Sequence, residues 1–145
     1  GYMHRDVKSL NVFLSEGVEA KIADFGFCTR DSSSSDLCGT HQWMAPEVIP
    51  NLFRIKNVYG PQVDVYSFGV LLWELMHLRV PYAETGYNQV QVARLVMSEG
   101  LRPPISSSCP APVRALIEQC WATAATSRPN FVEVVDRLEA LCRPA

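Results

Sequence analysis

One segment of the sequence, residues 64–78, is apolar on nearly every face of the helix that its composition predicts. It begins with Asp64, an acid that the dipole of a helix favours at this end. A helix without a broad polar face belongs at the centre of a protein core. The most apolar stretch, residues 68–76, is too short to cross a bilayer. The segment therefore predicts a buried central helix, with the rest of the chain packed around it.

Apolar periodicity and terminal signals predict further helices around this one. The first spans residues 88–98 and is followed by a glycine that stops it. The second begins at Pro112, and the third spans residues 131–141. Both carry apolar stripes at helical spacing, which predict faces that pack in the core. A shorter helix is expected to begin at Pro46, because proline suits a first turn, and to end at Pro50.

Two short apolar runs, residues 12–14 and 20–23, flank a turn-forming stretch that contains Gly17. This pattern predicts a β-hairpin. A hairpin centred near Gly17 and Val18 brings position 11 opposite position 24, so we expect Asn11 and Asp24 to meet at its open end. The predicted fold is mainly α (α+β overall), with a small β-hairpin and a helical bundle around the buried central helix.

Residues 4–11, His-Arg-Asp-Val-Lys-Ser-Leu-Asn, form a polar loop directly before this hairpin. Within it, Asp6 is suited to accept a proton, Lys8 to face a phosphate and Asn11 to face a metal ion. An amide oxygen from Asn11 and a carboxylate from Asp24 are hard ligands of the kind that Mg²⁺ binds. For any one of these residues alone, a solvated polar loop is the competing interpretation.

Composition limits the classes of function. The 145 residues have the length of one domain, and 13 Lys and Arg against 15 acidic residues argue against a nucleic-acid binder. Five scattered cysteines lack metal-ligand spacing, which argues against a zinc site. They predict reduced thiols and a cytoplasmic setting. The sequence shows no basic and apolar leader, so no signal peptide is expected.

Several blocks in order resemble the second half of a eukaryotic protein kinase domain. The blocks are His4-Arg5-Asp6 with Lys8 and Asn11, Asp24-Phe25-Gly26, Ala45-Pro46-Glu47, Asp64 to Gly69, Cys120-Trp121 and Arg128 to Phe131. The resemblance covers essentially all 145 residues. It implies a kinase C-terminal lobe with the catalytic loop at residues 4–11 and the activation segment at residues 24–47. Residues 43–48 and 64–75 are similar to the tyrosine-kinase-like group of serine/threonine kinases.

The resemblance implies roles that fit the chemistry of these side chains. Asp6 accepts the proton of the attacking hydroxyl and orients it, and Lys8 neutralises charge on the transferred phosphoryl group. Asn11 and Asp24 hold Mg²⁺. The implied cofactors are ATP and Mg²⁺, with Lys8, Asn11 and Asp24 at the nucleotide, and the implied partner is a protein substrate.

Other roles implied by the resemblance are structural. Glu47 and Arg128 form a buried ion pair, and Asp64 braces the backbone of the catalytic loop. Arg5 is placed to dock a phosphorylated activation segment, and the serine run at residues 32–35 supplies candidate phosphosites, none of which stands out. Thr40 lies in the substrate-facing loop. Phosphorylation by an upstream kinase or by the protein itself is expected.

A complete kinase has a Gly-rich loop, a strand lysine paired with a helix glutamate, and a hinge, and none of these precedes residue 1. The long helix before the catalytic loop is also missing. We therefore expect the chain to be an inactive fragment of a competent kinase, with apolar surface exposed where that helix packs on the central helix. Whether the full-length protein has a membrane anchor elsewhere stays an open question.

Two alternatives stay open for function. Lys8, two residues after Asp6, resembles serine/threonine kinases, and dual-specificity or tyrosine kinases are the second choice. The other alternative is a non-catalytic, kinase-like interaction module that docks through the helix at residues 88–98. Intact Asp6, Asn11 and Asp24 argue against that module.

Overall fold

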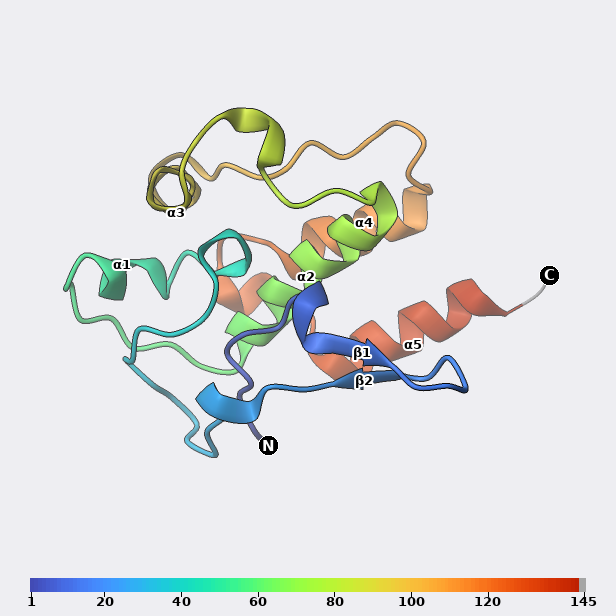
Figure 1. The fold of residues 1–145 in the computed structure, drawn as a ribbon, viewed down its shortest axis with the longest axis horizontal. Helices are drawn as coiled ribbons and strands as arrows, with labels where there is room; N and C mark the ends of the chain where they lie inside the picture. The colour runs from blue at the N-terminus through green and yellow to red at the C-terminus, as the bar shows by residue number, and fades with distance from the viewer. Residues whose placement is uncertain (144–145) are drawn as a thin grey trace.

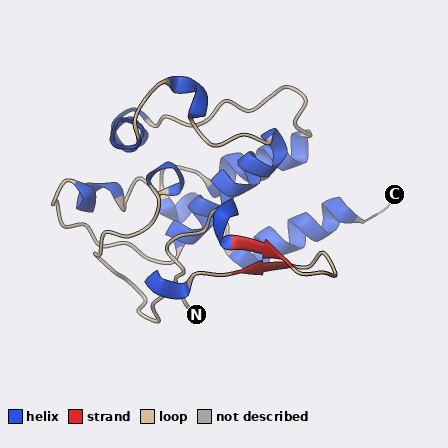
Figure 2. Cartoon of the chain, viewed as in Figure 1, coloured by secondary structure: helices blue, strands red, loops and turns tan. Residues whose placement is uncertain are grey.

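The computed structural model describes residues 1–143 as a group of helices beside one small hairpin (Figures 1 and 2). This architecture confirms the predicted fold class. The strands are β1 (Val12–Leu14) and β2 (Ala20–Ile22), which pair in an antiparallel manner. The helices are α1 (Ile49–Leu52), α2 (Gln62–His77), α3 (Gln89–Glu99), α4 (Ala111–Cys120) and α5 (Phe131–Cys142). Single turns of 3₁₀-helix are η1 (Ser9–Asn11), η2 (Phe25–Phe27), η3 (His41–Trp43), η4 (Ala83–Thr85) and η5 (Ala125–Ser127).

Helix α2 lies at the centre of the fold, as the sequence predicts (Figure 1). Its residues from Val63 to Trp73 are buried, apart from the partly buried Phe68. The last turn differs, because the side chains of Leu75 and Met76 are 57% and 39% exposed. The end of the helix therefore projects from the core. Within residues 1–143, no helix is both long enough and apolar enough to cross a membrane.

Helices α2 and α4 approach each other closely at Gly69. A Cβ atom at this position would lie 2.7 Å from the Cβ of Cys120, a separation that packed side chains do not tolerate. On α4, Leu116, Ile117 and Cys120 are buried, and Trp121 at its end is buried too. The apolar stripe of α4 is therefore a core face, as predicted.

Helix α5 buries less of its apolar stripe than the sequence predicts. Val134 is 1% exposed, whereas Phe131, Val135 and Leu141 are 42%, 50% and 41% exposed. The helix contacts α4, and the rings of Phe131 and Phe68 lie in a T-shaped arrangement with their centroids 5.8 Å apart. The prediction of a full core face was wrong here, because periodicity identifies an apolar side and not the element that covers it.

The short helix near the two prolines also differs from the prediction. Residues 46–48 form a turn, and α1 begins after it, at Ile49, with Pro50 in the first helical turn. Proline is accepted there because the first amides of a helix have no partner within the helix. Pro50 therefore opens the helix that it was predicted to end.

Helix α3 has the boundaries that its end signals predict. The Asn88 side chain caps the helix by accepting a hydrogen bond from the N–H of Gln91, and the Gln91 side chain accepts one from the backbone N–H of Asn88. Gly100 ends it with a φ of 68°, a left-handed conformation that glycine adopts without strain. The buried side chains Val92 and Val96 attach the helix to the core.

Candidate active site

A buried carboxylate on α2 holds the polar loop at residues 4–11. Asp64 Oδ2 accepts a hydrogen bond from the backbone N–H of His4 at 2.6 Å, and Oδ1 accepts one from the N–H of Arg5 at 2.7 Å. Burial raises the pKa of Asp64, and the two N–H groups oppose this rise only in part. Arg5 has a φ of 69°, a strained value for a residue with a side chain, and these bonds hold it there. Asp64 thus braces the loop as the resemblance implies.

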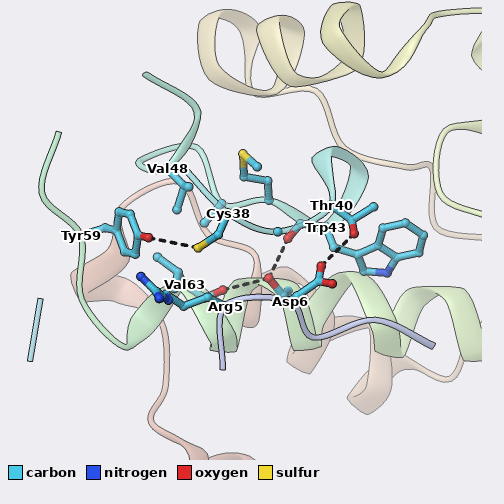
Figure 3. Close-up of a pocket in the computed structure, with 12 residues that line it drawn as sticks. Arg5, Asp6, Cys38, Thr40, Trp43, Val48, Tyr59 and Val63 are labelled. Carbon is cyan, nitrogen blue, oxygen red and sulfur yellow. Dashed lines mark hydrogen bonds between the residues drawn. The ribbon is translucent and has the colours of Figure 1, made fainter. Parts of the chain in front are cut away.

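The carboxylate of Asp6 is the centre of this loop, and it is 5% exposed. Its Oδ2 accepts hydrogen bonds from Lys8 Nζ at 2.7 Å and from Asn11 Nδ2 at 3.1 Å. Its Oδ1 accepts one from Thr40 Oγ1 at 2.8 Å (Figure 3). Burial by itself raises the pKa of Asp6, but these donors, Lys8 first, outweigh that effect and lower the pKa below its ordinary value. The carboxylate is therefore held ionised.

Thr40 joins this group from a distant part of the sequence. Lys8 Nζ donates to Thr40 Oγ1 at 2.7 Å while it also pairs with Asp6, so the three side chains form a closed set. The side chain of Lys8 is 15% exposed. Reasoning from the sequence placed Thr40 in the substrate-facing loop but missed its contact with Asp6, because nothing in local spacing links the two positions.

The hairpin register is one residue away from the prediction. Val12 pairs with Ile22, and the N–H of Ala23 donates to the carbonyl of Asn11 at 2.9 Å, so Asn11 lies opposite Ala23. Asp24 follows directly with a φ of 61°. Its exposed carboxylate accepts a hydrogen bond from the N–H of Gly26 at 3.4 Å. The structure therefore brings Asp6, Lys8 and Asn11 into one network, and it places Asp24 next to that network but outside its hydrogen bonds.

His4 links the loop at residues 4–11 to the end of the strand that leads to Asp24. Its Nδ1 accepts the N–H of Asp6 at 3.3 Å, and therefore its Nε2 carries the proton that bonds the carbonyl of Ala23 at 3.0 Å. The rings of His4 and Phe25 also lie in a T-shaped arrangement, with their centroids 5.3 Å apart. This connecting role was not predicted, and the only signal for it in the sequence was the position of the histidine in the loop.

The side chain of Arg5 points away from Asp6 and holds the segment between residues 27 and 36. Its Nη1 donates to Ser34 Oγ at 2.9 Å and to Asp36 Oδ2 at 3.0 Å, and its Nε bonds the carbonyl of Phe27. The guanidinium lowers the pKa of the Asp36 carboxyl group. Of the four serines at residues 32–35, the structure therefore brings Ser34 to Arg5.

Glu47 and Arg128 form the ion pair that the resemblance implies. The Nη1 and Nη2 atoms of Arg128 lie 2.6 Å and 2.8 Å from the two carboxylate oxygens of Glu47. The Arg128 side chain is fully buried and also donates to the carbonyls of Ala122 and Gln62. The pair ties Glu47, in the turn before α1, to α2 and to the loop before α5.

Comparison with known proteins agrees with the resemblance to protein kinases. A family model for protein tyrosine and serine/threonine kinases matches residues 1–138. The chain is 38% identical over 144 residues to a probable serine/threonine-protein kinase of Dictyostelium discoideum, covering 97% of this chain and 15% of that protein. It is 38% identical over 142 residues to the serine/threonine/tyrosine-protein kinase HT1 of Arabidopsis thaliana, with 96% and 35% covered.

A third relative is the human mitogen-activated protein kinase kinase kinase 10. It is 39% identical over 149 residues, which cover 96% of this chain and 15% of the relative. The chain thus spans between 15% and 35% of the length of these three curated relatives. Since the family model spans nearly the whole chain, the chain belongs to the protein tyrosine and serine/threonine kinase family.

Proposed function

We propose that this chain forms the C-terminal lobe of a protein kinase that transfers the γ-phosphate of ATP to serine and threonine hydroxyls of proteins. One observation carries the proposal: the buried Asp6 carboxylate accepts hydrogen bonds from Lys8, Thr40 and Asn11. Phosphoryl transfer depends mainly on positioning and on stabilising charge, and this network supplies a fixed acceptor beside a fixed cation.

The Asp6 carboxylate has one lone-pair position that none of these donors uses. A carboxylate offers about four lone-pair positions, of which Thr40 uses one on Oδ1, while Lys8 and Asn11 use two on Oδ2. The remaining position on Oδ1 is suited to the hydroxyl of a substrate. Because the pKa of Asp6 is lowered, the carboxylate is a weak base. Its role is to orient the hydroxyl and to accept its proton late in the transfer.

Lys8 is suited to the transferred phosphoryl group. Its ammonium group has three N–H donors, and two of them are used by Asp6 and Thr40. The third is available for a phosphoryl oxygen. Thr40 fixes the ammonium group from the side of residues 34–40. The position of Lys8, two residues after Asp6, resembles serine/threonine kinases, and this resemblance supports serine and threonine as acceptors over tyrosine.

The residues at the open end of the hairpin fit Mg²⁺-ATP. The amide nitrogen of Asn11 is committed to Asp6, so its amide oxygen is the atom that remains for a cation. The Asp24 carboxylate is exposed and bonds only one N–H, at 3.4 Å, among the described residues. When bound, Mg²⁺ neutralises charge on the phosphates and lines up the transferred group. Asn11 and Asp24 are the residues that would hold it.

The rest of the proposal concerns the whole protein. Because the chain spans a minor part of its relatives, we place the residues that cover ATP elsewhere in the full-length protein. The substrate is a protein, and the activator is an upstream kinase or the protein itself. The cysteines of residues 1–143 are free thiols, which supports a cytoplasmic domain.

The test is phosphate transfer by the full-length protein. Serine, threonine and tyrosine versions of one peptide are offered with Mg²⁺-ATP, and Asp6→Asn is compared with Asp31→Asn, a matched change on the exposed surface. We expect transfer to the serine and threonine peptides that Asp6→Asn slows roughly 100-fold or more and Asp31→Asn preserves. Transfer that is equal in wild type and Asp6→Asn would reject the assignment, and transfer to the tyrosine peptide alone would reject the acceptor class.

A further inference from the structure

The loop between α1 and α2 has a backbone that hydrogen bonds hold in place. Asn51 Nδ2 donates to the carbonyl of Asn57 at 3.0 Å, and Asn51 Oδ1 accepts the N–H of Asn57 at 2.7 Å. The side chain of Asn57 in turn donates to the carbonyl of Glu47 at 2.8 Å. Arg54 has a φ of 60°, a strained value that persists only where the surrounding structure fixes it. The loop is therefore a fixed element at the edge of the molecule beside α1 (Figure 1).

This fixed loop exposes large apolar side chains. Phe53, Ile55 and Val58 are 38%, 61% and 62% exposed, whereas the next residue, Tyr59, is 4% exposed and belongs to the core. Single exposed apolar residues are ordinary on a protein surface, but several on one short loop mark an interaction site. The loop thus presents apolar side chains to a partner and does not bury them itself.

Two cations lie between these apolar residues. Arg54 and Lys56 are both exposed, and neither forms an ion pair with any acidic side chain of residues 1–143. Surfaces that recognise each other are complementary in charge, so two cations without an acid select an acidic partner.

A hollow of about 230 Å³ lies where this loop meets residues 35–37. Its lining consists of Ser35, Leu37, Asn51, Arg54 and Lys56. Pockets for small molecules usually have volumes of about 300–1,000 Å³, so the hollow is better suited to one side chain of a peptide. Leu37 is 47% exposed and supplies an apolar wall between the two cations and the solvent. Lipid headgroup sites usually need about four to eight basic residues, more than this loop has.

We propose that the loop at residues 53–58, together with Leu37, binds an acidic peptide segment of another protein. A large apolar side chain of that segment occupies the hollow, and its acidic side chains pair with Arg54 and Lys56. Because the loop backbone is already fixed, binding costs little further ordering. The surface adds a partner to the proposed function and does not depend on phosphate transfer, since it shares no residue with the network around Asp6.

The test is binding of short fluorescent peptides to the full-length protein, measured by anisotropy. The first peptide carries leucine and phenylalanine among glutamates. The second replaces the glutamates by glutamine, and the third replaces the two apolar residues by serine. We expect saturable binding of the first peptide that weakens as salt is added, and roughly tenfold weaker binding of the other two. Equal binding of all three peptides, or no binding of the first, would overturn the proposal.

Charge variants locate the site on the protein. Arg54→Gln combined with Lys56→Gln should weaken binding of the acidic peptide roughly fivefold or more. The matched control is Lys21→Gln combined with Arg94→Gln, which removes two exposed cations elsewhere and should leave binding unchanged. Arg54→Glu combined with Lys56→Glu should bind a lysine version of the peptide in place of the acidic one. Equal weakening by the control pair would show attraction by overall charge and would overturn the site.

An apolar variant tests the hollow itself. Leu37→Ser should weaken binding of the acidic peptide, whereas Val18→Ser, an equally simple change at an exposed position of the hairpin, should not. All these side chains are exposed, so each variant should melt at the temperature of wild type. Binding to Leu37→Ser with the affinity of wild type would overturn the role of the hollow.

Two further measurements separate this proposal from others. Vesicles of phosphatidylserine and phosphatidylcholine should not bind through Arg54 and Lys56. Vesicle binding that the double glutamine variant abolishes, without peptide binding, would overturn the proposal in favour of a membrane surface. Asp6→Asn should bind the acidic peptide as wild type does. If wild type binds this peptide but transfers no phosphate, the kinase assignment fails and the docking surface stands.

Discussion

The hydroxyl of Thr40 donates a hydrogen bond to Asp6 Oδ1 across 2.8 Å, although the two residues are 34 positions apart in the sequence. Lys8 Nζ bonds both of them. The contact joins the segment that contains Thr40 to the loop at residues 4–11, so the Asp6 carboxylate, which we propose as the proton acceptor, and Thr40 cannot move independently. Activity should therefore depend on a residue that transfers no proton itself.

Removal of the Thr40 hydroxyl tests this dependence. Thr40→Val keeps the shape of the side chain but leaves Asp6 Oδ1 and Lys8 without one partner. Because hydrogen bonds to charged groups are among the stronger ones, we expect kcat to fall roughly tenfold or more. Thr40→Ser keeps the hydroxyl and should retain most of the wild-type kcat. Steady-state kinetics of the full-length protein measure both, and equal kcat values for Thr40→Val and wild type would contradict the role of the hydroxyl.

The Glu47–Arg128 pair should be a large contributor to stability. Glu47→Gln leaves the fully buried Arg128 without its anion, and such a loss costs about 3–5 kcal/mol. Urea unfolding measures the free energy of unfolding of the variant and of the wild type. The control is Glu84→Gln, which breaks an exposed pair with Arg79 and should change stability by less than about 1 kcal/mol. A similar loss of unfolding free energy in Glu47→Gln and Glu84→Gln would contradict a larger contribution from the buried pair.

Gly69 should not accept even a methyl group. Gly69→Ala places a Cβ 2.7 Å from the Cβ of Cys120, which forces α2 and α4 apart. We expect a loss of about 1–3 kcal/mol, as for other overpacked cores. Gly17→Ala, whose Cβ meets only the Ser15 side chain at 3.8 Å, is the control and should be close to neutral. A melting temperature that is unchanged by Gly69→Ala would contradict this packing.

The lowered pKa of Asp6 predicts a pH dependence of stability. The ordinary value is 3.8, and in the folded protein Lys8, Thr40 and Asn11 lower it. The folded state therefore binds fewer protons than the unfolded state in this range, and the contribution of Asp6 is fully present above the ordinary value. It should be lost as the pH falls through the lower, folded value. The difference in unfolding free energy between wild type and Asp6→Asn, measured from neutral to acidic pH, should shrink at the acidic end. A constant difference would contradict it.

Much of the fold follows from the sequence, for identifiable reasons. Helix α2 is apolar all round, and α3 has an Asn88 cap and a glycine stop, so local chemistry determines both. The braces made by Asp64 and by Glu47 with Arg128 were implied by the family resemblance and not by spacing. The exposure of the apolar face of α5 was not predictable, because the spacing of apolar residues does not show which element packs against that face.

The parts of the site that were missed depend on details that local patterns do not encode. The hairpin register shifted by one residue because its connection is centred on Gly17, with Ser15 N–H bonded to the Glu19 carbonyl at 2.9 Å and Val18 at a φ of 60°. A valine gives no sign of that conformation. Four consecutive serines are equivalent in sequence, and only the position of Arg5 in space distinguishes Ser34.

The central claim is that the buried group around Asp6 carries out phosphoryl transfer, and the rate of a single turnover tests it most directly. Full-length protein in excess over Mg²⁺-ATP, with a saturating serine peptide, reports the chemical step without product release. We predict that Asp6→Asn slows this step roughly 100-fold or more, while Asp31→Asn leaves it unchanged. A single-turnover rate for Asp6→Asn equal to that of wild type would contradict the account.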